Sequence, residues 1–157
     1  MDVGGQRNER RKWPKCFNEV DAVLYFESLS SFNQKMEEDN KTNRMKESLK
    51  IFNHVCNNKW FKKSLMVLIF TKKDIFNQKL NQYQLKETFP HFSGSNNFEE
   101  TTKFLQHEFV SQSDNKKKKF LVYFLDSLDS ENVKSTINSF VDDIFQNSAK
   151  EVSYFDI

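Results

Sequence analysis

Residues 65–70 read Leu-Met-Val-Leu-Ile-Phe, and the polar stretch Thr71-Lys72-Lys73-Asp74 follows them directly. Two more apolar runs lie at residues 22–29 (AVLYFESL) and 120–125 (FLVYFL). Short, nearly continuous apolar runs are typical of strands that a parallel sheet buries on both faces. The sequence therefore predicts three strands of a parallel sheet.

Apolar residues at helical spacing lie between these runs and after the last one, which indicates an α/β layer fold. The apolar stripes consist of Met45, Leu49, Phe52 and Cys56; of Phe98, Leu105 and Phe109; and of Val133, Ile137, Phe140, Val141 and Ile144. Asn97 and Glu100 form a capping pair for the second helix, and Asp129 or Ser130 caps the third. Three such strands leave an open sheet edge, so we expect part of a larger fold.

The composition argues against several classes of protein. The chain has 157 residues, which suits one domain, and its 24 basic and 22 acidic residues leave a net charge of +2. Neither this charge nor residues 116–119 (KKKK), which lack interleaved aromatics, predict a nucleic-acid partner. Two cysteines without CxxC spacing predict neither a disulfide scaffold nor a zinc site. No apolar run reaches about 18 residues, so we expect a soluble, intracellular chain without a transmembrane segment.

The glycines bear on nucleotide binding. The chain has three, Gly4, Gly5 and Gly94. A phosphate-binding loop GxxxxGK[ST] needs two glycines five positions apart, and the dinucleotide motif GxGxxG needs three close together. Neither spacing occurs, so we expect no phosphate loop within residues 1–157.

Several short motifs taken together resemble one known family. They are Asp2-Val3-Gly4-Gly5-Gln6-Arg7, Glu9-Arg10-Arg11-Lys12-Trp13, Cys16-Phe17, Asn43-Arg44-Met45-x-Glu47-Ser48-Leu49, Cys56-Asn57-Asn58-Lys59-Trp60-Phe61 and Lys72-Lys73-Asp74-Ile75-Phe76. In order and spacing they resemble the heterotrimeric G protein alpha subunits, from switch II to the C-terminus. The resemblance implies an α/β fold, the C-terminal portion of a Ras-like P-loop GTPase, with about three parallel strands and flanking helices.

The resemblance also implies a domain organisation. The family's phosphate loop, inserted helical domain and switch I, with its catalytic arginine and Mg²⁺-binding threonine, have no counterpart in this sequence. We therefore expect residues 1–157 to form a single partial Ras-like domain. Residues 1–18 correspond to the switch II segment, and residues 130–157 to the C-terminal helix and tail.

The resemblance assigns the nucleotide phosphates to Asp2, Val3, Gly4, Gly5 and Gln6. It implies that the glycines let the backbone approach the γ-phosphate, that Asp2 holds Mg²⁺ through water, and that Gln6 orients the attacking water. The alternatives are a plain tight turn for the glycines and a frayed terminal carboxylate for Asp2. Because a phosphate loop and an arginine finger are missing, we expect no measurable GTP hydrolysis through Gln6.

Guanine recognition is assigned by the resemblance to the family's Asn-Lys-x-Asp position and to a second loop: Thr71, Lys72, Lys73 and Asp74, together with Ser127. Asp74 would accept two N–H groups of the base, and Lys72 would lie along the base face. Thr71 lacks the paired donor and acceptor of asparagine, and Asp126 brings a negative charge beside Ser127. A solvated polar loop is therefore the alternative for residues 71–74, and we expect the second loop to be mostly lost as a site.

Six residues match the switch II helix that contacts the beta subunit in the family: Arg7, Arg10, Lys12, Trp13, Cys16 and Phe17. An exposed tryptophan beside basic residues has the composition of an interface hot spot, and the alternative is packing of Trp13 and Phe17 under the sheet. The resemblance implies a G beta-gamma dimer and a G protein-coupled receptor as partners, and GTP or GDP with Mg²⁺ as cofactors. It implies a cytoplasmic location, or attachment through partners to the inner face of the plasma membrane.

Three functions stay open at this point. The first is a guanine nucleotide-binding alpha-subunit-like protein that modulates or transduces receptor signalling, with GTP binding and hydrolysis impaired or lost. The second is a non-enzymatic decoy or interaction module that binds G beta-gamma or the receptor. The third is a truncated gene product without a stable fold, because an exposed sheet edge promotes aggregation.

Overall fold

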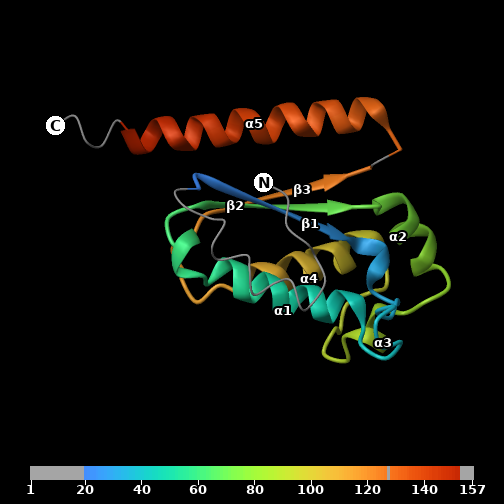
Figure 1. Ribbon diagram of the computed structural model, residues 1–157. Helices are drawn as coiled ribbons and strands as arrows, with labels where there is room; N and C mark the ends of the chain where they lie inside the picture. The colour runs from blue at the N-terminus through green and yellow to red at the C-terminus, as the bar shows by residue number, and fades with distance from the viewer. Residues whose placement is uncertain (1–19, 127, 153–157) are drawn as a thin grey trace.

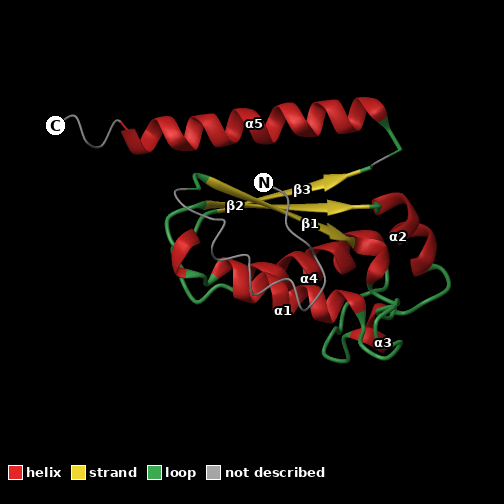
Figure 2. Cartoon of the chain, viewed as in Figure 1, coloured by secondary structure: helices red, strands yellow, loops and turns green. Residues whose placement is uncertain are grey.

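The computed structural model describes residues 20–126 and 128–152, which form an α/β layer fold (Figures 1 and 2). Its one sheet consists of β1 (Ala22–Ser28), β2 (Leu65–Thr71) and β3 (Phe120–Leu125). All strands are parallel, and their order is β1-β2-β3. The three predicted strands are confirmed. The predicted open edge is confirmed as well, since within the described residues β1 and β3 each pair only with β2.

Helices cover the two faces of the sheet unequally. The long helices are α1 (Arg44–Cys56), α4 (Phe98–Val110) and α5 (Ser130–Val152). Figure 2 shows α1 and α4 below the strands and α5 above them. The short elements are α2 (Lys73–Leu80), α3 (Leu85–Thr88) and the 3-10 turns η2 (Leu29–Ser31) and η3 (Lys59–Phe61). The three predicted apolar stripes thus lie on the three long helices.

Side-chain caps begin two of the predicted helices. The Asp129 carboxylate accepts hydrogen bonds from the N–H groups of Glu131 and Asn132 at 3.1 and 3.0 Å, so Asp129 rather than Ser130 caps α5. Asn97 Oδ1 accepts from Glu100 N at 2.8 Å. The second half of the predicted capping pair is wrong, because the Glu100 carboxylate instead accepts from Ser95 N at 2.7 Å. Gly94 leaves room for this carboxylate, because a Cβ at that position would lie 2.6 Å from Glu100 Oε2.

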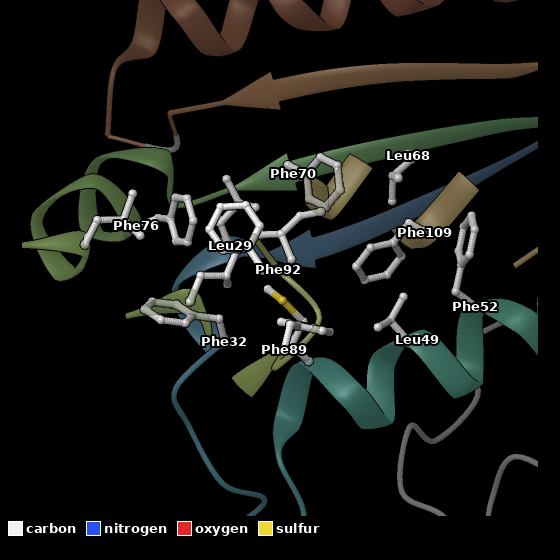
Figure 3. Packing of buried hydrophobic residues seen from close by; sticks show 14 of the residues in the cluster. Leu29, Phe32, Leu49, Phe52, Leu68, Phe70, Phe76, Phe89, Phe92 and Phe109 are labelled. Atoms are coloured by element: carbon white, nitrogen blue, oxygen red, sulfur yellow. The ribbon is translucent and has the colours of Figure 1, made fainter. Parts of the chain in front are cut away.

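The larger core lies between the sheet and the helices α1 and α4, and it is rich in phenylalanine (Figure 3). Phe109 of α4 is fully buried. Its ring centroid lies 5.4 Å from that of Phe52 on α1 and 5.5 Å from that of Phe70 on β2. Both contacts are edge-to-face, which adds about 0.5–1.5 kcal/mol per pair beyond apolar burial. Phe109 therefore joins three elements of the fold.

A smaller core holds α5 against the other face of the sheet. Phe140 of α5 is buried with Val67 and Ile69 of β2. The hydroxyl of Tyr123 on β3 donates a hydrogen bond to the carboxylate of Asp143 on α5. Burial, then this hydrogen bond and the negative charge of Asp143, raise the pKa of Tyr123 to about 12. The phenol therefore keeps its proton through the neutral range and remains a donor to α5.

The prediction of burial on both faces is wrong for β1. Leu24 is 43% exposed and Phe26 is 58% exposed, and both lie on the sheet face that α5 covers elsewhere. The apolar cluster beneath α5 draws its residues from β2 and β3 and from α5 itself, so α5 does not cover β1. Ile137, predicted to face the sheet, is also exposed, because α5 contacts the sheet further along, around Phe140.

Candidate functional site

The carboxyl ends of the parallel strands meet at one edge of the sheet, where the chain leaves β2 and β3 through neighbouring loops (Figure 1). Thr71 lies opposite Leu125 in the register of β2 and β3. The stretch of residues 71–74 therefore neighbours the stretch that follows residue 125. Ligands of open parallel sheets bind outside this edge. The structure thus places residues 71–74, which are four of the five residues predicted for base recognition, at the edge where a ligand of this fold would lie.

Thr71 ends β2, and its hydroxyl is engaged within the sheet. Oγ1 donates a hydrogen bond to the carbonyl oxygen of Glu27 on β1 at 3.2 Å. A hydroxyl has a single hydrogen to donate, so this bond leaves Thr71 without a donor for another group. The side chain serves to join the ends of β1 and β2.

Lys72 forms the turn between β2 and α2. Its φ of 57° places it in the left-handed region, which residues other than glycine rarely occupy. The turn closes when Phe76 N donates to the Lys72 carbonyl oxygen at 3.0 Å. Backbone strain of this kind occurs preferentially at ligand-binding turns. The Lys72 side chain is exposed beyond the sheet edge, while its backbone directs the chain into α2.

Asp74 lies in the first turn of α2, where the helix dipole favours a carboxylate. Its side chain is half-buried. Within residues 20–126 and 128–152, no hydrogen bond or ion pair engages this carboxylate. Its two oxygens can therefore accept two N–H groups, which is the pattern that one edge of guanine presents. Lys73 precedes it and is likewise half-buried.

Lys79 is a residue near this edge that the sequence motifs did not indicate. Its Nζ donates to the Ser30 carbonyl oxygen at 2.9 Å and to Asn33 Oδ1 at 2.8 Å, so it ties α2 to η2 and the following loop. Burial, and then the positive charge of Lys72, lower the pKa of Lys79. No sequence signal identifies it, because its partners are a backbone carbonyl and an amide far away in the chain.

The sequence motifs do not indicate Glu27 either, although its position in an apolar run is a signal. It is a charged residue in the apolar run 22–29, and the structure buries it. An acidic residue at a core-facing position of a strand needs partners, because burying an unpaired charge is costly. That requirement would have marked Glu27 as unusual from the sequence alone.

The second loop starts at Asp126, which is half-buried. Its backbone N–H donates to Asn132 Oδ1 at 2.9 Å, and its own Oδ1 accepts from Leu128 N at 3.2 Å. The Asp126 carboxylate directly precedes Ser127 in the sequence, and Ser127 itself lies outside the described residues. A negative charge there opposes the approach of an electron-rich carbonyl such as guanine O6.

The other predicted site residues also lie outside the described residues. They are the phosphate, catalytic and Mg²⁺ positions Asp2, Val3, Gly4, Gly5 and Gln6, and the beta-gamma contacts Arg7, Arg10, Lys12, Trp13, Cys16 and Phe17. In the part of the chain that the structure does describe, His, Cys, Asp and Glu side chains form no group of three that could hold a metal ion. The helices described there are too short or too polar to cross a membrane.

A three-stranded parallel sheet with helices on both faces and polar loops at its carboxyl edge defines an α/β layer protein, here part of a Ras-like GTPase fold. A model of the G-protein alpha subunit family matches residues 1–144, and the chain belongs to that family. It is 38% identical over 148 residues to a guanine nucleotide-binding protein alpha-2 subunit of Caenorhabditis briggsae, and 37% identical over 148 residues to that of Caenorhabditis elegans. Each alignment covers 94% of this chain and 42% of the relative. The chain thus spans less than half the length of these relatives.

Proposed function

We propose that this chain is an alpha-subunit-like guanine nucleotide-binding protein that modulates or transduces G protein-coupled receptor signalling, and that its GTP binding and hydrolysis are impaired or lost. The family match and the printed name of its relatives support the ligand class. The observation that supports impaired nucleotide binding is the hydrogen bond from Thr71 Oγ1 to the Glu27 carbonyl oxygen. That bond uses the first side chain of the base-recognition stretch to hold two strands together.

The described residues fit a guanine base only in part. Asp74 offers a carboxylate to the N–H edge, and the stem of Lys72 offers an apolar surface to the ring face. Thr71 has no donor left for the base, and Asp126 repels its carbonyl oxygen. Guanine contacts at this edge therefore rest on one favourable carboxylate, and we expect weak binding.

Titration of the purified chain with a fluorescent guanine nucleotide and Mg²⁺ tests the impairment. We expect no saturable binding up to about 100 µM nucleotide, since that affinity requires more than 5 kcal/mol of binding free energy. Replacing Asp74 with Asn should leave the signal unchanged, as should Asp142→Asn at an exposed position on α5. GTP turnover should stay at background in the wild type and in Gln6→Leu. Saturable Mg²⁺-dependent binding that Asp74→Asn abolishes would instead show that residues 71–74 still form a working nucleotide site.

The departures at Thr71 and Asp126 favour a second candidate function, a non-enzymatic decoy or interaction module. Such a protein would occupy a G beta-gamma dimer or a receptor without needing nucleotide. Its contacts would come from the switch II residues Arg7, Arg10, Lys12, Trp13, Cys16 and Phe17, which keep the composition of an interface hot spot. The two candidates differ in whether association depends on nucleotide.

Trp13→Ala tests this second candidate. We expect this substitution to weaken association with a purified G beta-gamma dimer by about 2 kcal/mol, or about thirtyfold in Kd. A tryptophan that the partner buries at the centre of an interface contributes binding free energy of that size. Biolayer interferometry with and without GDP measures the change. Trp60→Ala removes a different exposed tryptophan, on η3, and should leave the Kd within about twofold. Equal binding by the wild type and Trp13→Ala would remove the basis for the decoy.

A further inference from the structure

Glu27 places a carboxyl group inside the fold, at the end of the edge strand β1. The residue is 5% exposed. Ser31 Oγ on η2 donates to one carboxyl oxygen at 2.8 Å, and Ser48 Oγ on α1 donates to the other. Within the described residues, these hydroxyls are its hydrogen-bond partners, and no cation forms an ion pair with it. The carboxyl therefore joins strand, turn and helix through groups that suit both its neutral and its charged form.

We propose that Glu27 is a proton-operated switch that sets the position of η2 and, through it, of the loop Thr71–Asp74. Two connections lead from the carboxyl to that loop. Thr71 Oγ1 bonds to the carbonyl oxygen of Glu27 itself, and the Ser30 carbonyl beside Ser31 accepts from Lys79 on α2. The switch concerns this chain's own conformation and holds whether or not the loop binds guanine.

The hydrogen bonds around Glu27 can reverse with its protonation. When the carboxyl is charged, both serine hydroxyls donate to it, while the Tyr25 hydroxyl, whose oxygen lies 2.8 Å from Ser48 Oγ, donates to the Ser48 carbonyl oxygen at 2.9 Å. When the carboxyl takes a proton from solvent, its own O–H donates to Ser48 Oγ, which frees the serine hydrogen for Tyr25. Loss of the proton leaves a buried negative charge, which favours an opening of η2 that admits water.

The charged groups around Glu27 are few. Its neighbour on β2 is Phe70, and neither β2 nor η2 contains a titratable residue. Helix α1 brings Arg44, which is exposed, and α2 brings Lys79, which bonds to the Ser30 carbonyl and not to the carboxyl. On β1 itself, Tyr25 is the titratable residue that shares Ser48.

These surroundings place the titration of Glu27 near neutral pH. Burial raises the pKa of its carboxyl from the ordinary 4.5 to about 7, although the hydrogen bonds from Ser48 and Ser31 and the charge of Arg44 lower it. With a pKa near 7, both forms of the carboxyl are substantially populated within about one pH unit of the midpoint, from pH 6 to pH 8.

A pH titration of the full chain by NMR tests the switch directly. The ¹³C resonance of the Glu27 carboxyl and the amide resonances of Ser31, Ser48 and Thr71 are followed from pH 4 to 9. We expect one shared midpoint at about pH 7. In Glu27→Gln the amide transitions should disappear. In Glu37→Gln, which removes an exposed carboxylate, they should remain.

Ser48→Ala provides a second arm if Glu27→Gln does not fold. Because the Ser48 hydrogen bond lowers the pKa of Glu27, its removal should move the midpoint upward by about half a pH unit or more. A Glu27 midpoint near 4.5 would overturn the proposal. So would amide transitions that survive in Glu27→Gln, an unchanged midpoint in Ser48→Ala, or a titration that Ser31 and Thr71 do not share.

Discussion

Glu27→Gln will raise the free energy of unfolding at pH 8 by about 3 kcal/mol relative to the wild type. The native carboxyl keeps its proton up to about pH 7, whereas in the unfolded chain it ionises near 4.5. Between these values the native state binds more protons, so the wild type loses stability as the pH rises. Each unit between the two pKa values corresponds to about 1.4 kcal/mol, and glutamine, which never ionises, removes this loss.

Urea denaturation at pH 4.5, 6, 7 and 8 measures the difference from the transition midpoints. The free energy of unfolding of Glu27→Gln should exceed that of the wild type only slightly at pH 4.5. This difference should grow through pH 6 and level off above about pH 7. The free energy of unfolding of the surface variant Glu37→Gln should stay within about 0.5 kcal/mol of the wild-type value at every pH. A glutamine variant that is less stable than the wild type at pH 8 would show that the carboxylate is well solvated in the native state.

Phe109→Ala will lower the free energy of unfolding by about 3–5 kcal/mol, the usual cost of deleting a fully buried phenylalanine ring. Phe109 joins α4 to Phe52 on α1 and Phe70 on β2, so its loss leaves a cavity among three elements that cannot all move inward. A domain of this size has about 5–15 kcal/mol of stability in total. The variant should therefore unfold at a much lower urea concentration.

Phe145→Ala is the matched control for this variant, since that ring is 70% exposed on α5. Its effect should stay within about 0.5 kcal/mol. Circular dichroism at 222 nm follows both transitions on the full chain. A cost below about 1.5 kcal/mol for Phe109→Ala would mean that the aromatic cluster closes around the gap, which the edge-to-face contacts with Phe52 and Phe70 argue against.

The sequence predicts the layers of this fold well, because burial leaves a strong periodic pattern. The continuous run at 65–70 became the central strand β2, and Asp129 became the cap of α5. The exposure of Leu24 and Phe26 could not be predicted, since it depends on where α5 crosses the sheet rather than on β1 itself. The hydrogen bond from Ser95 N to the Glu100 carboxylate likewise depends on the conformation of the chain before α4, which the capping pattern does not encode.

The sequence predicts the candidate site only where its residues are adjacent in one motif. Residues 71–74 follow a buried strand, so their place at the carboxyl edge could be inferred from order alone. The engagement of Thr71 with Glu27 requires the register of β1 and β2, in which Ser28 lies opposite Thr71. Lys79 meets Ser30 and Asn33 only after α2 folds against η2. Contacts between distant segments leave no local pattern in one sequence.

The sheet divides the apolar interior into two clusters, and from this division we expect α5 to open separately from the rest of the fold. The cluster of Phe140 with Val67 and Ile69 shares no residue with the phenylalanine cluster on the opposite face, so its opening should leave that cluster in place. Subglobal opening of this kind requires less free energy than global unfolding. During synthesis α5 is also the last described element to leave the ribosome, so it docks onto a sheet whose other side is already covered. We therefore expect α5 to be the last described helix to dock and the first to open.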